Sequence, residues 1–266
     1  MNPAPRCNVL GVRLSATDYA AATQAVVAAA RAHAPFAAAA LAVHALMEAR
    51  RDADYRAKLN GLDLATPDGQ PVRWALDWLH GTALPDRVYG PFLMLRVCEA
   101  AAAEGLPVFL FGSTDATLVA LQGELTRRFP ALKIAGARAS RFREVGAAEA
   151  DADAAAIRAS GARLVFCGLG CPRQEHWVHA MRPRLDLPLV AVGAAFALWA
   201  GERPMAPGWM QRAGLEWLYR LAQEPRRLAF RYLVYNPWFV AAVLRQKISA
   251  TAYPAEGREV PPRHFG

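Results

Sequence analysis

The stretch LVFCGLGCPRQEHW, from Leu164 to Trp177, joins an apolar run, a glycine-rich turn and a polar helix start. Leu164–Cys167 has the length and composition of a buried strand. Gly168 and Gly170 allow backbone to approach a ligand closely, and Pro172 suits the first turn of a helix. A strand followed by a helix is the repeating unit of parallel α/β sheets.

The same succession of apolar run, turn and helix recurs along the chain. Val108–Gly112 reads as a strand, and the apolar spacing over Ala116–Arg128 predicts the helix after it. Further strands are predicted at Ala37–Val43, Leu62–Ala65 and Leu189–Val192. The sequence therefore predicts an α/β fold with a mostly parallel sheet and flanking helices.

Ligands of such sheets bind beyond the carboxyl ends of the strands, where the turns at Asp68, Ser113 and Gly168 lie. Asp68, in PDG, is either an ordinary turn residue or a carboxylate that takes a proton from a hydroxyl nucleophile. Arg87, in DRVYG, is either a surface residue or a partner for phosphate. The loop from Gly112 to Thr114 could hold a nucleotide phosphate or ribose.

The first helical turn after Pro172 has two interpretations. Its free N–H groups suit an anion, with Gln174 and Glu175 facing the cleft or its rim. The alternative is an ordinary strand-to-helix connection with a solvated polar turn. The chain lacks G-x-G-x-x-G and G-x-S-x-G, which disfavours a nicotinamide-dependent oxidoreductase and a serine hydrolase.

The composition favours an anionic partner. The chain of 266 residues is 54% hydrophobic and carries a net charge of +8. Residues 209–248 hold seven basic and two acidic residues among eight aromatics. Such a segment is typical of helices in a membrane interface, although a helical pair packed on the core is the alternative. Nucleic acid is disfavoured, because the rest of the chain has no basic groove.

Four residues of this segment stand four apart and predict one charged helical stripe: Arg212, Glu216, Arg220 and Glu224. Leu215, Leu218 and Ala222 fall on another face. The proline-, glycine- and charge-rich residues 249–266 predict a disordered tail.

No apolar run reaches the length of a membrane span, and the amino terminus has no long apolar core. We therefore expect a cytoplasmic protein whose four cysteines are free thiols. Cys167, Cys171, His176 and His179 lie close in sequence, but their spacing is unlike that of zinc sites, and we expect no metal.

Five stretches together resemble one family. PDG, RVYG, VFLFGS, GLGCPRQEHW and APGWMQRAGLEWLYRLAQEPRRLAFRYL occur in the order found in the WecG/TagA/CpsF glycosyltransferases. The resemblance covers roughly residues 8–245, and GLGCPRQE and GLEWLYRLAQEPRR are its most specific parts.

The resemblance implies a Rossmann-like core over residues 1–207 and a membrane-contacting helical appendage over 208–248. It implies transfer of a sugar, with inversion and without metal, from a UDP-sugar to a polyprenyl-diphosphate-linked saccharide of the cell envelope. Asp68 matches the general base. The implied donor contacts are Gly112, Ser113, Gly168, Gly170, Gln174 and Glu175. The implied acceptor-phosphate contacts are Arg87, Arg212, Arg220, Arg226 and Arg227. The protein would be peripheral on the inner face of the membrane, with a homo-oligomer as a further expectation.

This chain departs from the family pattern at five positions where polar or charged residues are usual: Ala42, Phe92, Ala197, Met205 and Gly208. Each change removes a charge or a hydrogen-bonding group. These changes motivate an alternative hypothesis, in which the protein binds a membrane or a partner without catalysing transfer.

Overall fold

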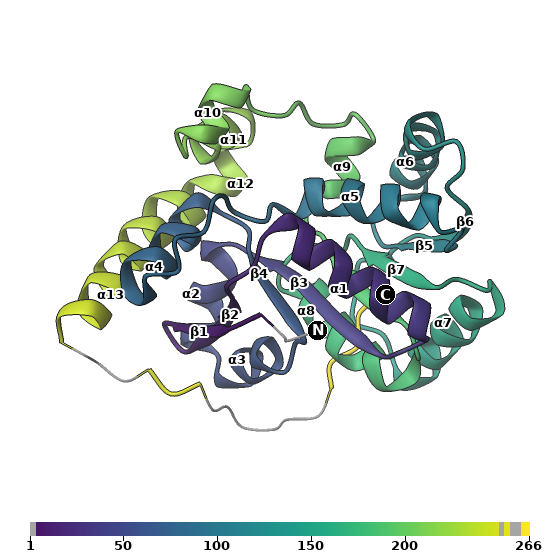
Figure 1. Ribbon diagram of the computed structural model, residues 1–266, viewed down its shortest axis with the longest axis horizontal. Coiled ribbons are helices and arrows are strands. Elements are labelled where there is room, and N and C mark those ends of the chain that lie inside the picture. The colour runs from purple at the N-terminus through teal and green to yellow at the C-terminus, as the bar shows by residue number, and fades with distance from the viewer. Residues whose placement is uncertain (1–3, 250–252, 256–261) are drawn as a thin grey trace.

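The structure, a computed structural model, describes residues 4–249, 253–255 and 262–266, and gives only the backbone of Arg227 and Arg231. Its centre is a six-stranded sheet in which every pairing is parallel, in the order β4-β3-β8-β7-β5-β6 (Figure 1). The strands are β3 (Phe36–Leu41), β4 (Leu64–Pro67), β5 (Val108–Phe111), β6 (Ile134–Arg138), β7 (Leu164–Cys167) and β8 (Pro188–Ala191). The predicted α/β fold is confirmed.

Helices cover both faces of the sheet (Figure 1). One face carries α1 (Tyr19–Ala32), α5 (Gly90–Ala103), α6 (Asp115–Arg128) and α9 (Ala195–Trp199). The other carries α2 (Val43–Arg51), α3 (Ala53–Asn60), α7 (Ala147–Ala159) and α8 (Arg173–Met181), with the short 3-10 helix Arg182–Arg184 after α8.

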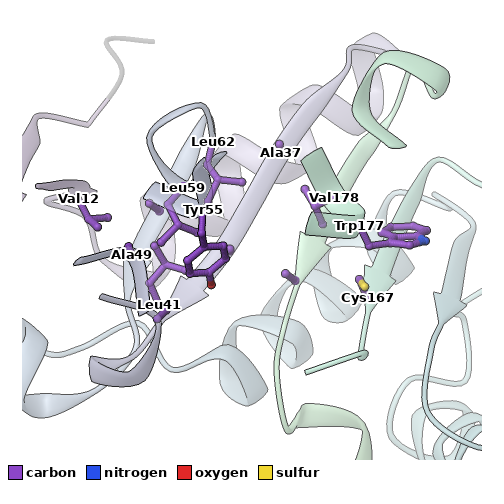
Figure 2. Packing of buried hydrophobic residues seen from close by; sticks show 14 of the residues in the cluster. Val12, Ala37, Leu41, Ala49, Tyr55, Leu59, Leu62, Cys167, Trp177 and Val178 are labelled. Atoms are coloured by element: carbon purple, nitrogen blue, oxygen red, sulfur yellow. The ribbon is translucent and has the colours of Figure 1, made fainter. Parts of the chain in front are cut away.

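Successive residues of each strand enter different hydrophobic clusters, because side chains alternate along a strand. In β7, Val165 and Cys167 join the cluster under α3 and α8, whereas Leu164 and Phe166 join the one under α5 and α6. Figure 2 shows part of the first cluster, including side chains of α3 and α8. Every residue of β7 is buried, which explains its uninterrupted apolar sequence.

A β-hairpin precedes this sheet. Strands β1 (Arg6–Val9) and β2 (Val12–Ser15) pair antiparallel across a turn in which Gly11 has a φ of 91°. The hydroxyl of Ser15 accepts a hydrogen bond from the backbone N–H of Ala65, at 3.2 Å, so the hairpin attaches to edge strand β4.

The carboxyl-terminal segment is helical, as predicted. It forms α10 (Gly208–Arg212), α11 (Glu216–Gln223), α12 (Pro225–Phe230), the π-helix Arg231–Tyr235 and α13 (Asn236–Ile248). Phe239 and Val243 of α13 belong to the central hydrophobic cluster, and α13 lies along α4 (Gln70–His80) (Figure 1). Helix α13 is therefore packed on the α/β core, whereas α10 and α11 lie together at one end of the molecule (Figure 1).

The prediction of a disordered tail over 249–266 is wrong for its two described stretches. The backbone carbonyl of Tyr253 accepts a hydrogen bond from the Asn8 side chain at 2.8 Å. Phe265 is buried against the ring of His176, with centroids 5.7 Å apart, and the backbone carbonyl of His264 accepts from Val145 N–H at 3.0 Å. One buried aromatic ring and a few hydrogen bonds hold these two stretches. The prediction for residues 250–252 and 256–261 lies outside the described residues.

Candidate functional site

The loops at Asp68, Ser113 and Gly168 meet beyond the carboxyl ends of the parallel strands, as predicted. The loops that follow β3, β4, β5, β7 and β8 line one cavity, here called the sheet-edge cavity, which is bounded by Ser113, Gly168, Gly170, Gln174, Gly193 and Ala197. A second cavity, here called the α11 cavity, is bounded by Gln70, Arg87, Tyr89, Glu216, Trp217 and Tyr232.

Asp68 lines both cavities. It follows β4 directly, and its carboxylate accepts a hydrogen bond from the first backbone N–H of α5, that of Gly90, at 3.1 Å. Removal from water raises the pKa of Asp68 to about 6, although the nearby Arg87 and the Gly90 N–H lower it. At neutral pH this carboxylate is ionised. Its pKa also lies close to neutral pH, and a general base is most effective when its pKa is near the working pH.

Arg87 lies in the α11 cavity, where its guanidinium donates to the carboxylate of Glu216 and lies over the ring of Tyr89 at 4.4 Å. The ion pair holds α11 against the loop before α5. Arg220, one turn after Glu216 on α11, lines both cavities. Two of the five predicted phosphate-binding arginines are thus placed beside Asp68.

Two of the other predicted arginines, Arg212 and Arg226, are not brought there. Arg212 and Arg226 are exposed and outside both cavities, and the side chain of Arg227 lies outside the described part of the chain. The predicted single stripe is also wrong, because Gly214, with a φ of 72°, separates α10 from α11. The remaining charged residues of the stripe point inward, with Glu216 paired to Arg87 and Glu224 to Arg203.

The glycines in the loops after β5 and β7 have different roles. A Cβ on Gly168 would lie 2.6 Å from the ring of Phe196, so glycine is required for that packing. A Cβ on Gly112 would lie 3.0 Å from the backbone of Gly168, and Gly112 itself does not line the sheet-edge cavity. Gly112 therefore allows the loops after β5 and β7 to approach, while Ser113, Gly168 and Gly170 face the cavity.

Gln174 and Glu175 separate at the first turn of α8, because consecutive helical residues point about 100° apart. Gln174 lines the sheet-edge cavity, and its side-chain oxygen accepts from Gly193 N–H at 3.0 Å. Glu175 is turned into the interior, where it accepts from Gln174 at 2.7 Å and from the Tyr55 hydroxyl at 3.1 Å. Burial raises the pKa of Glu175. We expected Glu175 to contact the donor directly. It does not line the sheet-edge cavity, and it instead accepts a hydrogen bond from Gln174, which does.

Two of the departures from the family pattern line a cavity, and a third packs against a residue that lines one. Ala42 and Ala197 line the sheet-edge cavity with methyl groups. Phe92 packs edge-on against both Tyr89 and Trp199, with ring centroids 5.8 and 5.9 Å apart. The phenyl ring thereby joins α5 to α9 through aromatic contacts.

His44, Glu202 and Arg203 also line the sheet-edge cavity, and sequence reasoning did not assign them a role. His44 could have been predicted as a site residue, because it follows β3. The carboxyl end of β3 lies on the same side of the sheet as the strand ends before Asp68 and Gly168. Glu202 and Arg203 follow α9 in a loop, and no local motif marks that loop as part of the site.

In the described residues, no three His, Cys, Asp or Glu side chains gather in a way that could hold a metal ion. Cys167 is buried in β7, as its place in an apolar strand suggests. Around Asp68 the cavities are lined by Arg87, Arg220, the His44 imidazole and the Glu216 carboxylate, and the guanidinium groups suit phosphate.

Two named proteins and one family model are similar to this chain. A protein of Bacillus spizizenii named N-acetylglucosaminyldiphosphoundecaprenol N-acetyl-beta-D-mannosaminyltransferase is 30% identical over 208 residues, 78% of this chain and 77% of that protein. A protein of the same name from Bacillus subtilis (strain 168) is 27% identical over 206 residues, 77% of each chain. The model of the glycosyl transferase WecG/TagA/CpsF family matches residues 7–253, and the chain belongs to this family.

Proposed function

We propose that this chain is an inverting glycosyltransferase that moves a sugar from a UDP-sugar to a polyprenyl-diphosphate-linked saccharide of the cell envelope. The observation that carries the proposal is the position of Asp68, a carboxylate lining two cavities at once. The names of the two Bacillus relatives, transferases acting on a lipid-linked diphosphate sugar, support the same chemistry.

In the proposed reaction the donor occupies the sheet-edge cavity and the acceptor the α11 cavity. The acceptor hydroxyl gives its proton to Asp68 and attacks the anomeric carbon of the donor sugar. A new glycosidic bond forms on one side of that carbon while its bond to the UDP oxygen breaks on the other. UDP leaves with the bonding electrons, and the anomeric configuration inverts.

Ser113, Gly168, Gly170 and Gln174 are the proposed donor contacts, because they line the sheet-edge cavity. Gly112 and Glu175 act through their neighbours. Arg87 and Arg220 are the proposed contacts of the acceptor diphosphate, because both line the α11 cavity. Arg212 and Arg226 are exposed, and we assign to them the contact with anionic lipid head groups. We assign Arg227 the same role from its sequence alone.

A peripheral position on the inner face of the membrane is part of the proposal. In the described ranges, none of the helices is both long and apolar enough to cross a bilayer. With the charged side of α11 turned inward, Leu218 faces outward at 45% exposure. Trp209, Phe230 and Leu233 nearby are still more exposed, so this surface combines aromatic and aliphatic groups with exposed arginines.

The test is to compare wild type with Asp68→Asn for transfer to a lipid-linked acceptor and, by calorimetry, for UDP binding. We expect transfer to fall at least ~10²-fold with nearly unchanged UDP affinity, because the amide cannot accept the proton. Asp115→Asn, an exposed carboxylate at the start of α6, is the control. Turnover retained by Asp68→Asn excludes Asp68 as the base. If wild type leaves the UDP-sugar unconsumed in the presence of suitable acceptors, the result favours the alternative, in which the protein binds a membrane or a partner without catalysis.

A further inference from the structure

Among the side chains that the structure describes, four line both cavities: Ala42, His44, Asp68 and Arg220. Under the proposed function, the donor's reacting carbon must meet the acceptor hydroxyl where the cavities join. The bond that breaks, between the sugar and the nearer phosphate of UDP, therefore lies among these four residues. Asp68 serves the attacking hydroxyl there. Of the others, Arg220 and His44 can carry positive charge.

His44 is held in one orientation by its neighbours. It lies in the first turn of α2, and its Nδ1 is 3.9 Å from the carboxylate of Glu48, one helical turn later. The ring of Tyr235 stacks on the imidazole, with centroids 5.6 Å apart and an interplanar angle of 22°. The Tyr235 hydroxyl donates to the same Glu48 oxygen at 2.6 Å and accepts from Arg51 at 2.8 Å.

Nδ1 is buried on the Glu48 side of the ring, and His44 lines both cavities. Nε2, across the ring from Nδ1, is therefore the nitrogen through which His44 can meet a ligand there. An imidazole can donate an N–H from Nε2, and a phosphate oxygen at the junction of the cavities would accept it.

We propose that His44 is a phosphate-binding residue that donates its Nε2–H to the donor phosphate bonded to the sugar. This inference rests on the proposed function and adds a residue to it. As the bond to the sugar breaks, that phosphate gains negative charge, and a positioned donor lowers the energy of the developing charge. Tyr235 is a positioning residue, because it acts on His44 through stacking and through Glu48.

The experiment compares the affinities of wild type and His44→Phe for UDP and UMP by calorimetry. Phenylalanine keeps a ring for Tyr235 to stack on but removes both nitrogens. We expect UDP affinity to fall about tenfold to a hundredfold, the value of one charge-assisted hydrogen bond, while UMP affinity stays the same. His80→Phe makes the same replacement outside both cavities and should change neither affinity.

A second variant of His44 and a second probe distinguish the proposed role from ring packing and from acceptor binding. His44→Gln restores an N–H donor of similar reach, and we expect it to recover part of the preference for UDP over UMP. A preference as low as that of His44→Phe would mean that ring packing matters rather than the donor, which overturns the assignment. Geranyl diphosphate is the probe for the acceptor phosphate, and a loss confined to it would move His44 to the acceptor side and refute the proposal.

The failures of this inference and of the proposed function differ. Equal UDP affinity in wild type and His44→Phe removes the role of His44 alone. A wild-type protein that does not bind UDP removes the proposed donor, and the inference with it.

Discussion

The guanidinium of Arg87 donates to the carboxylate of Glu216, and each side chain keeps only 9% of its surface exposed. The pair joins the loop before α5 to α11, which are far apart in sequence, and forms one wall of the α11 cavity. A contact that is both an anchor for a helix and a wall of a binding site couples stability to function.

Glu216→Ala should therefore lower the free energy of unfolding by about 3 kcal/mol, because it leaves the Arg87 charge buried without its partner. Urea denaturation measures the loss. Glu104→Ala, which breaks the more exposed pair with Arg31, is the control and should cost less than about 1 kcal/mol. Equal losses in the two variants would show that the Arg87–Glu216 pair behaves as a surface contact.

The pH dependence of transfer should report Asp68, whose pKa is raised to about 6. Above that pH the carboxylate is ionised and can accept the proton, and below it kcat/KM should fall about tenfold per pH unit. Since the raised pKa means that ionising Asp68 is unfavourable in the fold, Asp68→Asn should be at least as stable as wild type at pH 7. If kcat/KM instead begins to fall only well below pH 5, a group other than Asp68 accepts the proton.

Gly168→Ala should destabilise the protein by about 1–3 kcal/mol, because its Cβ would lie 2.6 Å from the Phe196 ring. Moving Phe196 also disturbs the sheet-edge cavity, so UDP affinity should fall in parallel. Gly123→Ala is the control, since nothing lies within 4 Å of its Cβ in the interior of α6. That variant should gain about 0.5–1 kcal/mol in thermal or urea unfolding. A Gly168→Ala protein as stable as wild type would contradict the packing argument.

Leu218→Glu combined with Phe230→Glu should reduce binding to anionic vesicles by at least about tenfold, because two exposed apolar groups would no longer enter the interface. Point substitutions are preferable to removing the whole segment, since Phe239 and Val243 of α13 belong to the core. Val119→Glu, on the exposed side of α6, is the matched control. Unchanged sedimentation of the double variant with vesicles would place the membrane contact elsewhere.

The sheet and its functional edge could be predicted from the sequence, because buried parallel strands are continuous apolar runs that end in turns. Leu164–Cys167 is a strand with the predicted bounds, and the loops at Asp68, Ser113 and Gly168 do meet. Strand β6 was not foreseen, because its sequence IAGAR is only partly buried and weakly apolar.

The direction of individual side chains was harder to predict. Spacing four residues apart identified one face of α11, but not whether that face looks into the protein or out of it. Glu216 has its partner in Arg87, and no local sequence signal reveals a partner so far along the chain. Likewise, the adjacent Gln174 and Glu175 share one motif, and only the position of Tyr55 decides which of them enters the interior.

Helix α11 gives Arg220 to the junction of the two cavities and Leu218 to the outside, within a single turn. If this outer side rests on lipid as proposed, the acceptor needs no extraction from the bilayer. Pulling a prenyl chain into water would cost about 0.8 kcal/mol for each CH₂-sized group exposed. With the helix at the lipid boundary, the hydrocarbon stays dissolved in the membrane while only the diphosphate and its sugar rise the short way to Asp68.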